Sequence, residues 1–408
     1  MTATHQGVAR CLDITRLISR VGRGPFTGVD RVELAYLRRL AVGDLPAFGL
    51  CRTGLGFVLL DADGLRAVLA RVEGTVPWGA VDILGRLSRK AHPLKRSAEA
   101  DLRRLAIARC FRGGLAGMLK RCLPVGTEYL NVGHSGLTAA SLSAWNSVEK
   151  SQVSVLVHDL IPLDFPEYQR DGTVAAFEAK MRAVAQYADR VICISGPTRL
   201  RVLHWFSKWG CELPTVVAHL GVDVPPVIAA ELPDELRLPG PYFVAVGTIE
   251  PRKNHALLLD IWDQLGPDAP TLVIAGSRGW KNADVFRRLD AKPPHVIEAP
   301  GLSDGALGAL IKGASGLLFP THAEGFGLPP AEALALGTPV ICSNLQVFHE
   351  ILGNKPIYAE SDDMYLWKQS IEGLIEKGST EHNGKASEAV SFNAPTWADH
   401  FNLVLKLT

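Results

Sequence analysis

The sequence predicts an α/β protein built from two doubly wound parallel sheets. Short apolar and β-branched runs recur along the chain, each followed by a polar or glycine turn and then by a helical period. The runs are continuously apolar, which is typical of parallel strands that helices cover on both faces. With 408 residues, 47% of them hydrophobic, the chain is also longer than one hydrophobic core usually supports. Two domains are therefore expected.

Ten apolar runs mark the expected strands, five in each half of the chain. They cover residues 10–14, 128–132, 153–158, 190–194 and 215–219, and then 242–246, 271–275, 295–298, 316–319 and 339–342. A proline-rich stretch, 224–241, separates the halves and is typical of an interdomain connection. We expect an N-terminal domain over residues 1–224, a C-terminal domain over 225–395, and a final helix over 396–408.

Overall composition excludes several classes of function. The net charge of +1 gives no reason to expect a nucleic-acid partner. Seven cysteines form no Cys-x-x-Cys pair, as expected for reduced core residues of a cytoplasmic protein. No run reaches the ~20 apolar residues that span a bilayer. The longest candidate, residues 48–60, is interrupted by Arg52 and three glycines, so any membrane contact is expected to be peripheral.

Residues 86–121 depart from this charge balance. They hold eleven basic residues against Glu99 and Asp101, a local excess of 11 − 2, or +9. Interleaved apolar residues predict basic amphipathic helices, which suit an anionic membrane surface or a lipid diphosphate acceptor. Helices of this composition also serve as a solvated face packed on their own domain, and the sequence leaves both interpretations open.

A glycine-rich loop followed by a short helix gives the strongest functional signal. It covers residues 321–339, after the expected strand 316–319, and prolines 329 and 330 are suited to the first turn. A helix that starts behind such a loop directs free N–H groups at an anionic ligand. Glu324 on the loop and Glu332, expected in the first helical turn, would repel a bare phosphate. A sugar nucleotide resolves this, since acids accept hydrogen bonds from sugar hydroxyls; taken singly, each acid is an ordinary surface residue.

A second signal follows the expected strand 242–246. Here Gly247 and Thr248 lead to Arg252 and Lys253, and Asn254 is expected to cap a helix that ends at Gly266. The two cations would stand at the carboxyl edge of the sheet, where α/β proteins bind ligands. Cations at this edge can neutralise a diphosphate leaving group.

Together, Glu-x7-Glu and the upstream Gly-x-x-x-Pro-Arg-Lys-Asn segment resemble the retaining glycosyltransferases of family 4, which have the GT-B fold. Residues 157–162, 194–195 and 219–223 fit the same pattern in the first half. The resemblance implies two Rossmann-like domains that face each other across a cleft. It also implies a donor in the C-terminal domain, an acceptor on the N-terminal domain, and a final helix that crosses back to the N-terminal domain.

The resemblance also assigns roles to residues. Glu324 would hold the donor sugar, Glu332 the ribose, and Arg252 and Lys253 the diphosphate, while His158 would reach the sugar from the facing domain. A lone histidine at a strand end is more often a packed residue, and its His-Asp-Leu-Ile-Pro setting favours the functional role. Further donor contacts are expected from loop residues that follow the strands: Gly247, Thr248, Gly276, Ser277, Gly301, Leu302, Gly325, Phe326, Gly327 and Leu328.

Two other motifs are interpreted by exclusion. The loop 20–31 has the first glycines of a dinucleotide fingerprint but not the next, and no strand-end acid follows, so a nicotinamide site is rejected. Gly28 of this loop is expected to approach the donor phosphates. Asp61-Ala-Asp63 spells a metal motif of other glycosyltransferases, but it lies far from the donor half and is interpreted as a turn. No metal and no cofactor are expected, since Arg252 and Lys253 already supply positive charge.

These expectations favour transfer of a hexose from a nucleotide diphosphate sugar to a glycan or lipid-linked oligosaccharide, with retention and without a metal. Similarity to bacterial polysaccharide enzymes favours GDP-mannose as the donor. The alternatives are a UDP-sugar or a GDP-deoxyhexose donor, a GT-B sugar-nucleotide 2-epimerase, and a non-catalytic binding module. The expected location is cytoplasmic, peripheral at the inner face of the plasma membrane.

Overall fold

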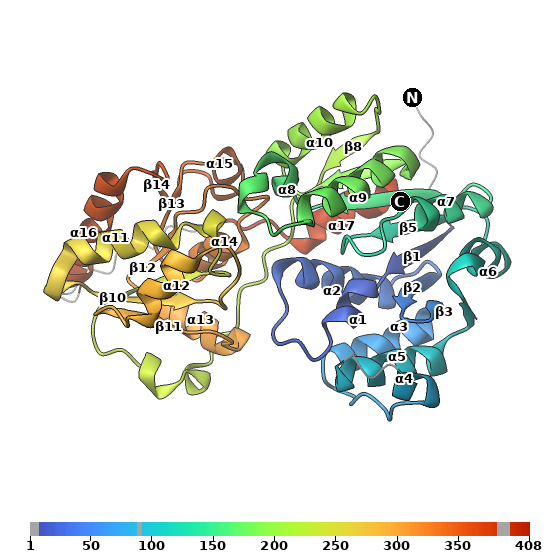
Figure 1. The fold of residues 1–408 in the computed structure, drawn as a ribbon, viewed down its shortest axis with the longest axis horizontal. Helices are drawn as coiled ribbons and strands as arrows, with labels where there is room; N and C mark the ends of the chain where they lie inside the picture. Colours follow the sequence, from blue (N-terminus) through green and yellow to red (C-terminus); the bar gives the residue numbers. More distant parts are fainter. Residues whose placement is uncertain (1–7, 88–91, 382–391) are drawn as a thin grey trace.

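A computed structural model describes residues 8–87, 92–381 and 392–408 of the chain. These residues form two lobes, each centred on one β-sheet with helices packed against it (Figure 1). One hydrophobic cluster extends from the first lobe into the second, because Leu12 and Phe319, among others, belong to the same contiguous core. The predicted α/β class with two Rossmann-like domains is confirmed.

The first lobe contains a sheet of order β4-β3-β2-β1-β5-β6-β7-β8. Its strands are β1 (Ala9–Asp13), β2 (Ala47–Thr53), β3 (Gly56–Leu60), β4 (Ala108–Cys110), β5 (Thr127–Asn131), β6 (Gln152–Val157), β7 (Arg190–Cys193) and β8 (Thr215–Val217). The five strands expected in this half are all present and pair in parallel with their neighbours. β2 adds to β1 in parallel.

The second lobe contains a sheet of order β11-β10-β9-β12-β13-β14, in which the pairing is parallel throughout. Its strands are β9 (Tyr242–Val246), β10 (Thr271–Ala275), β11 (Val296–Glu298), β12 (Gly316–Phe319), β13 (Val340–Ser343) and β14 (Ile357–Ala359). The five expected strands are again present. The edge strand β14 has only three residues and was not predicted.

Helices connect the strands in both lobes. In the first lobe they are α1 (Thr15–Arg20), α2 (Gly28–Ala41), α3 (Ala62–Val72), α4 (Ile83–Leu87), α5 (Pro93–Leu105), α6 (Leu115–Cys122), α7 (Ala139–Ser143), α8 (Ile161–Asp164), α9 (Thr173–Tyr187) and α10 (Gly196–Lys208). In the second half of the chain they are α11 (His255–Leu265), α12 (Ala283–Asp290), α13 (Asp304–Gly313), α14 (Leu328–Ala335), α15 (Gln346–Leu352), α16 (Met364–Glu381) and α17 (Trp397–Leu407). No helix of the described ranges is long and apolar enough to cross a bilayer.

One edge of the first sheet differs from the purely parallel prediction. The apolar stretch 48–60 forms a hairpin, with β3 antiparallel to both β2 and β4. Thr53 pairs with Gly56, which leaves Gly54 and Leu55 in the turn. Gly56 has φ +145°, and a Cβ there would lie 2.1 Å from the carbonyl oxygen of Cys110. The glycines that interrupt the apolar run are therefore part of a tight strand-to-strand contact.

The basic region 86–121 is only partly helical. Helices α5 and α6 are present, but the short strand β4 lies between them and pairs with β3. The strand β4 was not predicted, because an edge strand of three residues leaves almost no periodic signal. Arg89 and Lys90, which contribute to the predicted charge, lie outside the described residues.

Two predictions about turns and caps also change. Asp61 does not close a turn but caps α3, where its carboxylate accepts a hydrogen bond from the Gly64 amide at 2.9 Å. Asn254 does not cap α11 with its side chain; its backbone is left-handed, with φ +55°. The Asn254 amide group instead donates to the Ser361 carbonyl at 2.8 Å. Asp61 thus serves the helix that follows it directly, whereas Asn254 is bound by a distant chain segment.

The final helix, α17, returns to the first lobe as predicted (Figure 1). Tyr36 of α2 and His400 of α17 form a hydrogen bond of 2.8 Å, and both side chains are buried. The Arg10 guanidinium donates to the carbonyl oxygens of Leu405 and Thr408, each at 2.8 Å. These contacts satisfy carbonyl groups at the helix end, which have no partner within the helix.

Candidate functional site

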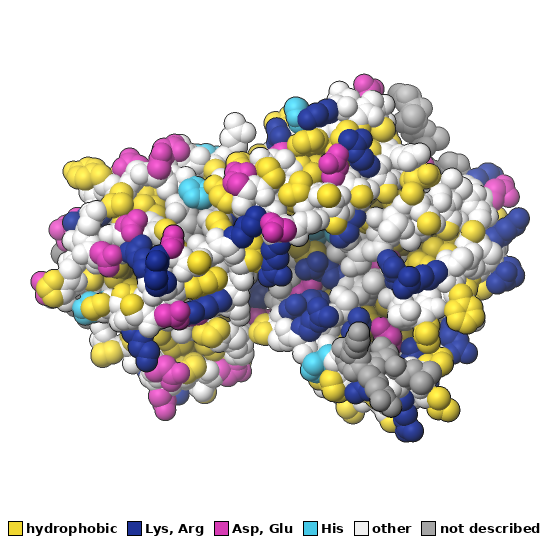
Figure 2. Space-filling model, viewed as in Figure 1, with side chains coloured by type: hydrophobic (Ala, Val, Ile, Leu, Met, Phe, Trp, Pro, Cys, Tyr) yellow, Lys and Arg dark blue, Asp and Glu magenta, His cyan; other side chains and the backbone are white. Residues whose placement is uncertain are grey.

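A cavity of about 690 Å³ lies between the two lobes, at the carboxyl ends of β9, β10, β11 and β12. This is the edge at which α/β proteins bind ligands. Every residue predicted to contact the donor lines it, from Gly28 and His158 of the first lobe to Glu332 of the second. Figure 2 shows the groove between the lobes, with basic side chains gathered along it.

The two predicted cations and one predicted acid of the second lobe are in direct contact. Arg252 donates from Nη1 to Oε1 of Glu324 at 2.8 Å, and the Lys253 ammonium contacts the same oxygen. Arg252 also donates to the Ala323 carbonyl at 2.7 Å and to Glu250 at 2.6 Å. Glu324 therefore holds the two cations in place, a pairing that the sequence did not reveal.

The contacts with Lys253 and Arg252 keep the Glu324 carboxylate charged although it is buried. Burial alone would raise the pKa of Glu324, but Lys253 and Arg252 outweigh it and lower the pKa to about 2. Burial likewise opposes the charge on Arg252, yet Glu324 and Glu250 raise its pKa above the ordinary value. The cluster presents fixed charges whose geometry is set before any ligand arrives.

The glycine loop before α14 approaches the first lobe closely. A Cβ on Gly325 would lie 2.2 Å from the carbonyl oxygen of His158, so only glycine fits. Ser195, at the start of α10, donates from its hydroxyl to the Gly325 carbonyl at 2.8 Å. Gly327 is left-handed, with φ +96°, and precedes the first residue of α14. The loop is thus braced from both lobes beside the helix N-terminus.

Gly276 also has a packing role. A Cβ on it would lie 1.8 Å from the carbonyl oxygen of Gly247, so the loops after β9 and β10 touch through their backbones. The cavity is also lined by Thr248, Ser277, Gly301 and Leu302.

His158 projects from the end of β6 and is 7% exposed. Its Nε2 lies 2.7 Å from the Val132 carbonyl oxygen, so Nε2 carries the proton and donates. Burial lowers the pKa of His158 to about 4. The imidazole is therefore neutral near pH 7 and suits hydroxyl groups better than phosphate.

Glu332 makes a contact across the cleft that sequence reasoning missed. Arg31 of α2 donates from Nη1 to Glu332 at 2.8 Å and from Nη2 to Asp304 at 2.6 Å. Glu332 is the fifth residue of α14, just past the first turn in which it was predicted. Burial raises the pKa of Glu332, and Arg31 counteracts this. Arg31 and Glu332 are 301 positions apart in the sequence. The only signal for this pair was that both segments were expected to lie at the same cleft.

The loop 20–31 reaches the cavity through several residues. A Cβ on Gly28 would lie 3.3 Å from a methyl group of Leu328, the first residue of α14. Thr27 and Asp30 form a capping box at the start of α2, and Asp30 also contacts Arg16 at 2.6 Å. These contacts fix the loop, and Gly28 with it, at the cavity.

Acidic residues that could hold a metal do not gather here. Asp61 and Asp63 belong to the start of α3, where Asp63 contacts Arg66 and Asp61 caps the helix. Across the described ranges, no group of three histidine, cysteine or acidic side chains has the geometry for a metal ion.

Solved structures share this arrangement over nearly the whole chain. HepE from Anabaena, in complex with UDP and glucose, superposes with a TM-score of 0.59 at 14% identity and covers 98% of this chain and 94% of its own. Sucrose-phosphate synthase from Thermosynechococcus elongatus gives 0.58 at 16% identity, over 91% of this chain and 90% of its own. Two facing Rossmann-like domains of this kind define the GT-B class.

The family is identified from the second half of the chain. Residues 231–389 match the model of glycosyl transferases group 1. This half of the chain therefore carries a group 1 glycosyltransferase domain, and the resemblance to family 4 is confirmed.

The chain is also similar to curated bacterial mannosyltransferases. The serotype-specific mannosyltransferase WbdA of Escherichia coli is 32% identical over 62% of this chain, but only 33% of its own length is covered. The O-antigen chain mannosyltransferase RfbU of Salmonella typhimurium is 35% identical over 33% of this chain and 38% of its own length. This chain thus spans about a third of these relatives.

Proposed function

We propose that the protein transfers a hexose from a nucleoside diphosphate sugar to a glycan or lipid-linked oligosaccharide, with retention at the anomeric carbon. The main support is the cluster of Arg252, Lys253 and Glu324 beside the N-terminus of α14. His158 lines the same cavity from the other lobe. Cations and free amide groups favour a diphosphate, and acids favour sugar hydroxyls.

The charges suit a front-face substitution. The acceptor oxygen bonds to the anomeric carbon on the face from which the diphosphate leaves. The bond from that carbon to the phosphate oxygen breaks, and the acceptor proton moves to the departing oxygen. Arg252 and Lys253 stabilise the negative charge that develops there, and the neutral His158 contacts the sugar. Glu324 orients the sugar and keeps both cations in position, while Glu332 accepts hydrogen bonds from the ribose.

GDP-mannose is the proposed donor. Its support is a group of relatives named as mannosyltransferases. Two of them are named for the O-antigen chain, which also favours a role in surface polysaccharide synthesis. UDP-glucose is the second candidate, because it is the ligand named for a solved relative with a TM-score of 0.59.

The test is turnover of purified protein with GDP-mannose, GDP-fucose or UDP-glucose, with and without an acceptor glycan. We expect donor binding to raise the Tm, and NMR of the product to show the anomeric configuration of the donor. An epimer formed from donor alone would establish the epimerase instead. Tight binding without turnover of any donor would establish a non-catalytic module, and either result would contradict the proposal.

We also propose that the first lobe docks on an anionic membrane surface through part of residues 86–121. Phe111 is 80% exposed and Ile107 47% exposed, next to exposed Arg109, Arg112 and Lys120. An apolar tip among cations is suited to anionic headgroups.

Other basic residues of the segment are less available for this contact. Arg103 contacts Asp82 at 2.6 Å, and Arg104 contacts Asp101 at the same distance. Flotation with phosphatidylglycerol vesicles tests the proposal, with phosphatidylcholine vesicles as the control. Binding that Phe111→Asp leaves unchanged would refute it.

A further inference from the structure

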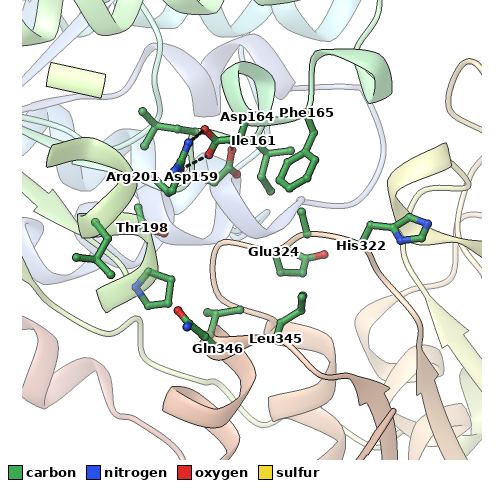
Figure 3. A pocket seen from close by; sticks show the side chains of 15 residues that line it. Asp159, Ile161, Asp164, Phe165, Thr198, Arg201, His322, Glu324, Leu345 and Gln346 are labelled. Atoms are coloured by element: carbon green, nitrogen blue, oxygen red, sulfur yellow. Dashed lines mark hydrogen bonds and ion pairs between the residues drawn. The ribbon is translucent and has the colours of Figure 1, made fainter. Parts of the chain in front are cut away.

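A second cavity, of about 570 Å³, shares lining residues with the first, and Figure 3 shows the side chains that line it. One wall comes from the first lobe, with the segment Asp159–Phe165 and the first turns of α10. The other wall comes from the loop after β12, with His322 and Glu324, and from the start of α15, with Gln346. The predicted donor contacts occupy the first cavity and leave this space unassigned.

The two cavities meet at a pair of carboxylates. Asp159 and Glu324 line both of them. Since Glu324 is assigned to the donor sugar, the second cavity adjoins the sugar end of the donor site and not the nucleotide end, where Gly301 and Glu332 lie. The two shared carboxylates thus place the second cavity next to the transferred sugar.

Asp159 differs from the other acids of this wall. Asp164 is occupied by Arg201, at 2.9 Å from Nε, and by the Trp205 indole N–H at 2.8 Å. Glu324 is occupied by Arg252 and Lys253. Within the described ranges, Asp159 has no ion pair, and its Oδ1 accepts only the Ile161 amide, at 3.0 Å. One carboxylate at the junction thus has capacity to accept a further hydrogen bond.

Aromatic rings extend this wall towards solvent. Phe165 stacks on Tyr168, with centroids 5.9 Å apart, and Tyr168 stacks on His322 of the other lobe at 5.6 Å. Phe165 and His322 both line the second cavity (Figure 3). Ring faces next to carboxylates offer apolar contact and hydrogen-bond acceptors together, which matches the apolar and hydroxyl faces of a sugar ring.

We propose that the second cavity binds the neutral terminal sugar of the acceptor glycan, and that Asp159 accepts a hydrogen bond from its attacking hydroxyl. This assignment rests on the proposed transferase function. The hydroxyl oxygen forms the new bond to the anomeric carbon while the bond to the diphosphate oxygen breaks. The proton passes to that departing oxygen, and Asp159 only orients the hydroxyl.

The charges of the cavity exclude an anionic acceptor end. Arg201 is paired with Asp164, while the cations nearest the junction are paired with Glu324. An acceptor phosphate in this space would face the Asp159 carboxylate, while the cations close to it, Arg201 and Arg252, are already paired with other acids. A lipid diphosphate would therefore have to lie outside the cavity, with a sugar inside it.

The first experiment replaces Asp159 by Asn, which keeps an oxygen for the Ile161 amide. Transfer from GDP-mannose to octyl α-D-mannopyranoside should lose roughly 10- to 100-fold in kcat/KM for the acceptor, as expected for a lost hydrogen bond to a charged group. GDP affinity should stay within about twofold of the wild type. Unchanged acceptor kinetics in D159N would overturn the assignment.

The second experiment fills the cavity. Leu200 of α10 lines it and is 61% exposed, whereas Leu203 of the same helix is 38% exposed and lies outside it. Leu200→Trp should abolish binding of methyl α-D-mannopyranoside, measured by saturation-transfer NMR with GDP present. Leu203→Trp, the matched control, should leave it intact. Equal binding in both variants would refute the assignment.

The outcomes separate the two proposals. If the wild type consumes neither GDP-mannose nor UDP-glucose, the proposed transferase function fails, and the acceptor site fails with it. If it consumes donor but binds mannose 1-phosphate in preference to the neutral glycoside, or binds no glycoside at all, only the acceptor site is wrong.

Discussion

The two walls of the donor cavity handle charge in opposite ways. The second lobe keeps Arg252, Lys253 and Glu324 ionised by packing them against one another, with the pKa of Glu324 lowered to about 2. On the first lobe, the His158 and Asp159 side chains each make one hydrogen bond and no ion pair within the described residues. Burial lowers the pKa of His158 to about 4 and raises that of Asp159 to about 6.

This difference fits the chemistry assigned to each side. A diphosphate needs fixed positive charge, which stays ionised in a buried site only when it is paired. Sugar hydroxyls are neutral, and a neutral imidazole or a lightly solvated carboxylate binds them without a large desolvation cost. The paired cations therefore suit the diphosphate leaving group, and the buried His158 and Asp159 suit the sugar hydroxyls.

The largest expected effect comes from breaking the charged wall. Glu324→Gln should lower kcat by about 10²- to 10³-fold, because Arg252 and Lys253 lose the group that positions them. Steady-state kinetics with GDP-mannose measure this. Glu298→Gln, at a partly exposed pair with Arg278, is the control and should stay near wild type. Full activity in E324Q would show that the charged cluster is not catalytic.

The second largest effect is expected where the two walls of the donor cavity touch. Gly325→Ala places a methyl group against the His158 carbonyl, so the lobes must move apart. We expect at least about a 10-fold loss of turnover and a lower Tm, as overpacking costs about 1–3 kcal/mol. Gly113, which has nothing within 4 Å of an added Cβ, is the control position. Wild-type turnover in G325A would indicate that the walls need not touch.

A third prediction concerns the contribution of the neutral His158 to the stability of the fold. The pKa of His158, about 4, is below the unfolded value near 6.5. Its contribution to stability is therefore complete above pH 6.5 and is lost as the pH falls towards 4, by up to roughly 3 kcal/mol. Urea unfolding at several pH values should show a weaker decline on acidification in His158→Gln than in wild type.

The pH dependence of stability has to be compared between H158Q and wild type, because other buried groups also contribute to it. Burial raises the pKa of Asp13 to about 6 and of Glu128 to about 7, which stabilises the fold as the pH falls and opposes the histidine. The exposed His204, changed to Gln, serves as the control. Parallel pH curves for H158Q and wild type would contradict the buried, neutral state of His158.

The smallest effect should come from the bridge between the walls. Arg31→Met frees Glu332 to accept ribose hydroxyls, so the affinity for GDP should rise by a few-fold, in line with about 1 kcal/mol for a partly exposed pair. Isothermal titration calorimetry measures it. Arg38 lies on the same helix as Arg31 and forms an ion pair with Glu73. Its replacement in Arg38→Met should leave the affinity for GDP unchanged. Weaker GDP binding in R31M would instead assign Arg31 to the nucleotide.

Local sequence patterns determined most of the fold and most of the donor wall. The ten predicted strands are present, since a continuous apolar run followed by a turn is a property of neighbouring residues. The loops that carry Arg252 and Glu324 follow such strands directly, so parallel pairing brings them to one edge of one sheet. Short edge strands such as β4 and β14 escaped prediction because three residues show no period.

Contacts between distant segments were decided by tertiary structure alone. The bond from Arg31 to Glu332, the pKa of Asp159 and the cavity beside Asp159 all depend on what the facing lobe places there. Residue types and spacing fix which groups stand at a strand end. Whether such a group stays charged depends on burial and on the partner across the cleft, and no local pattern records either.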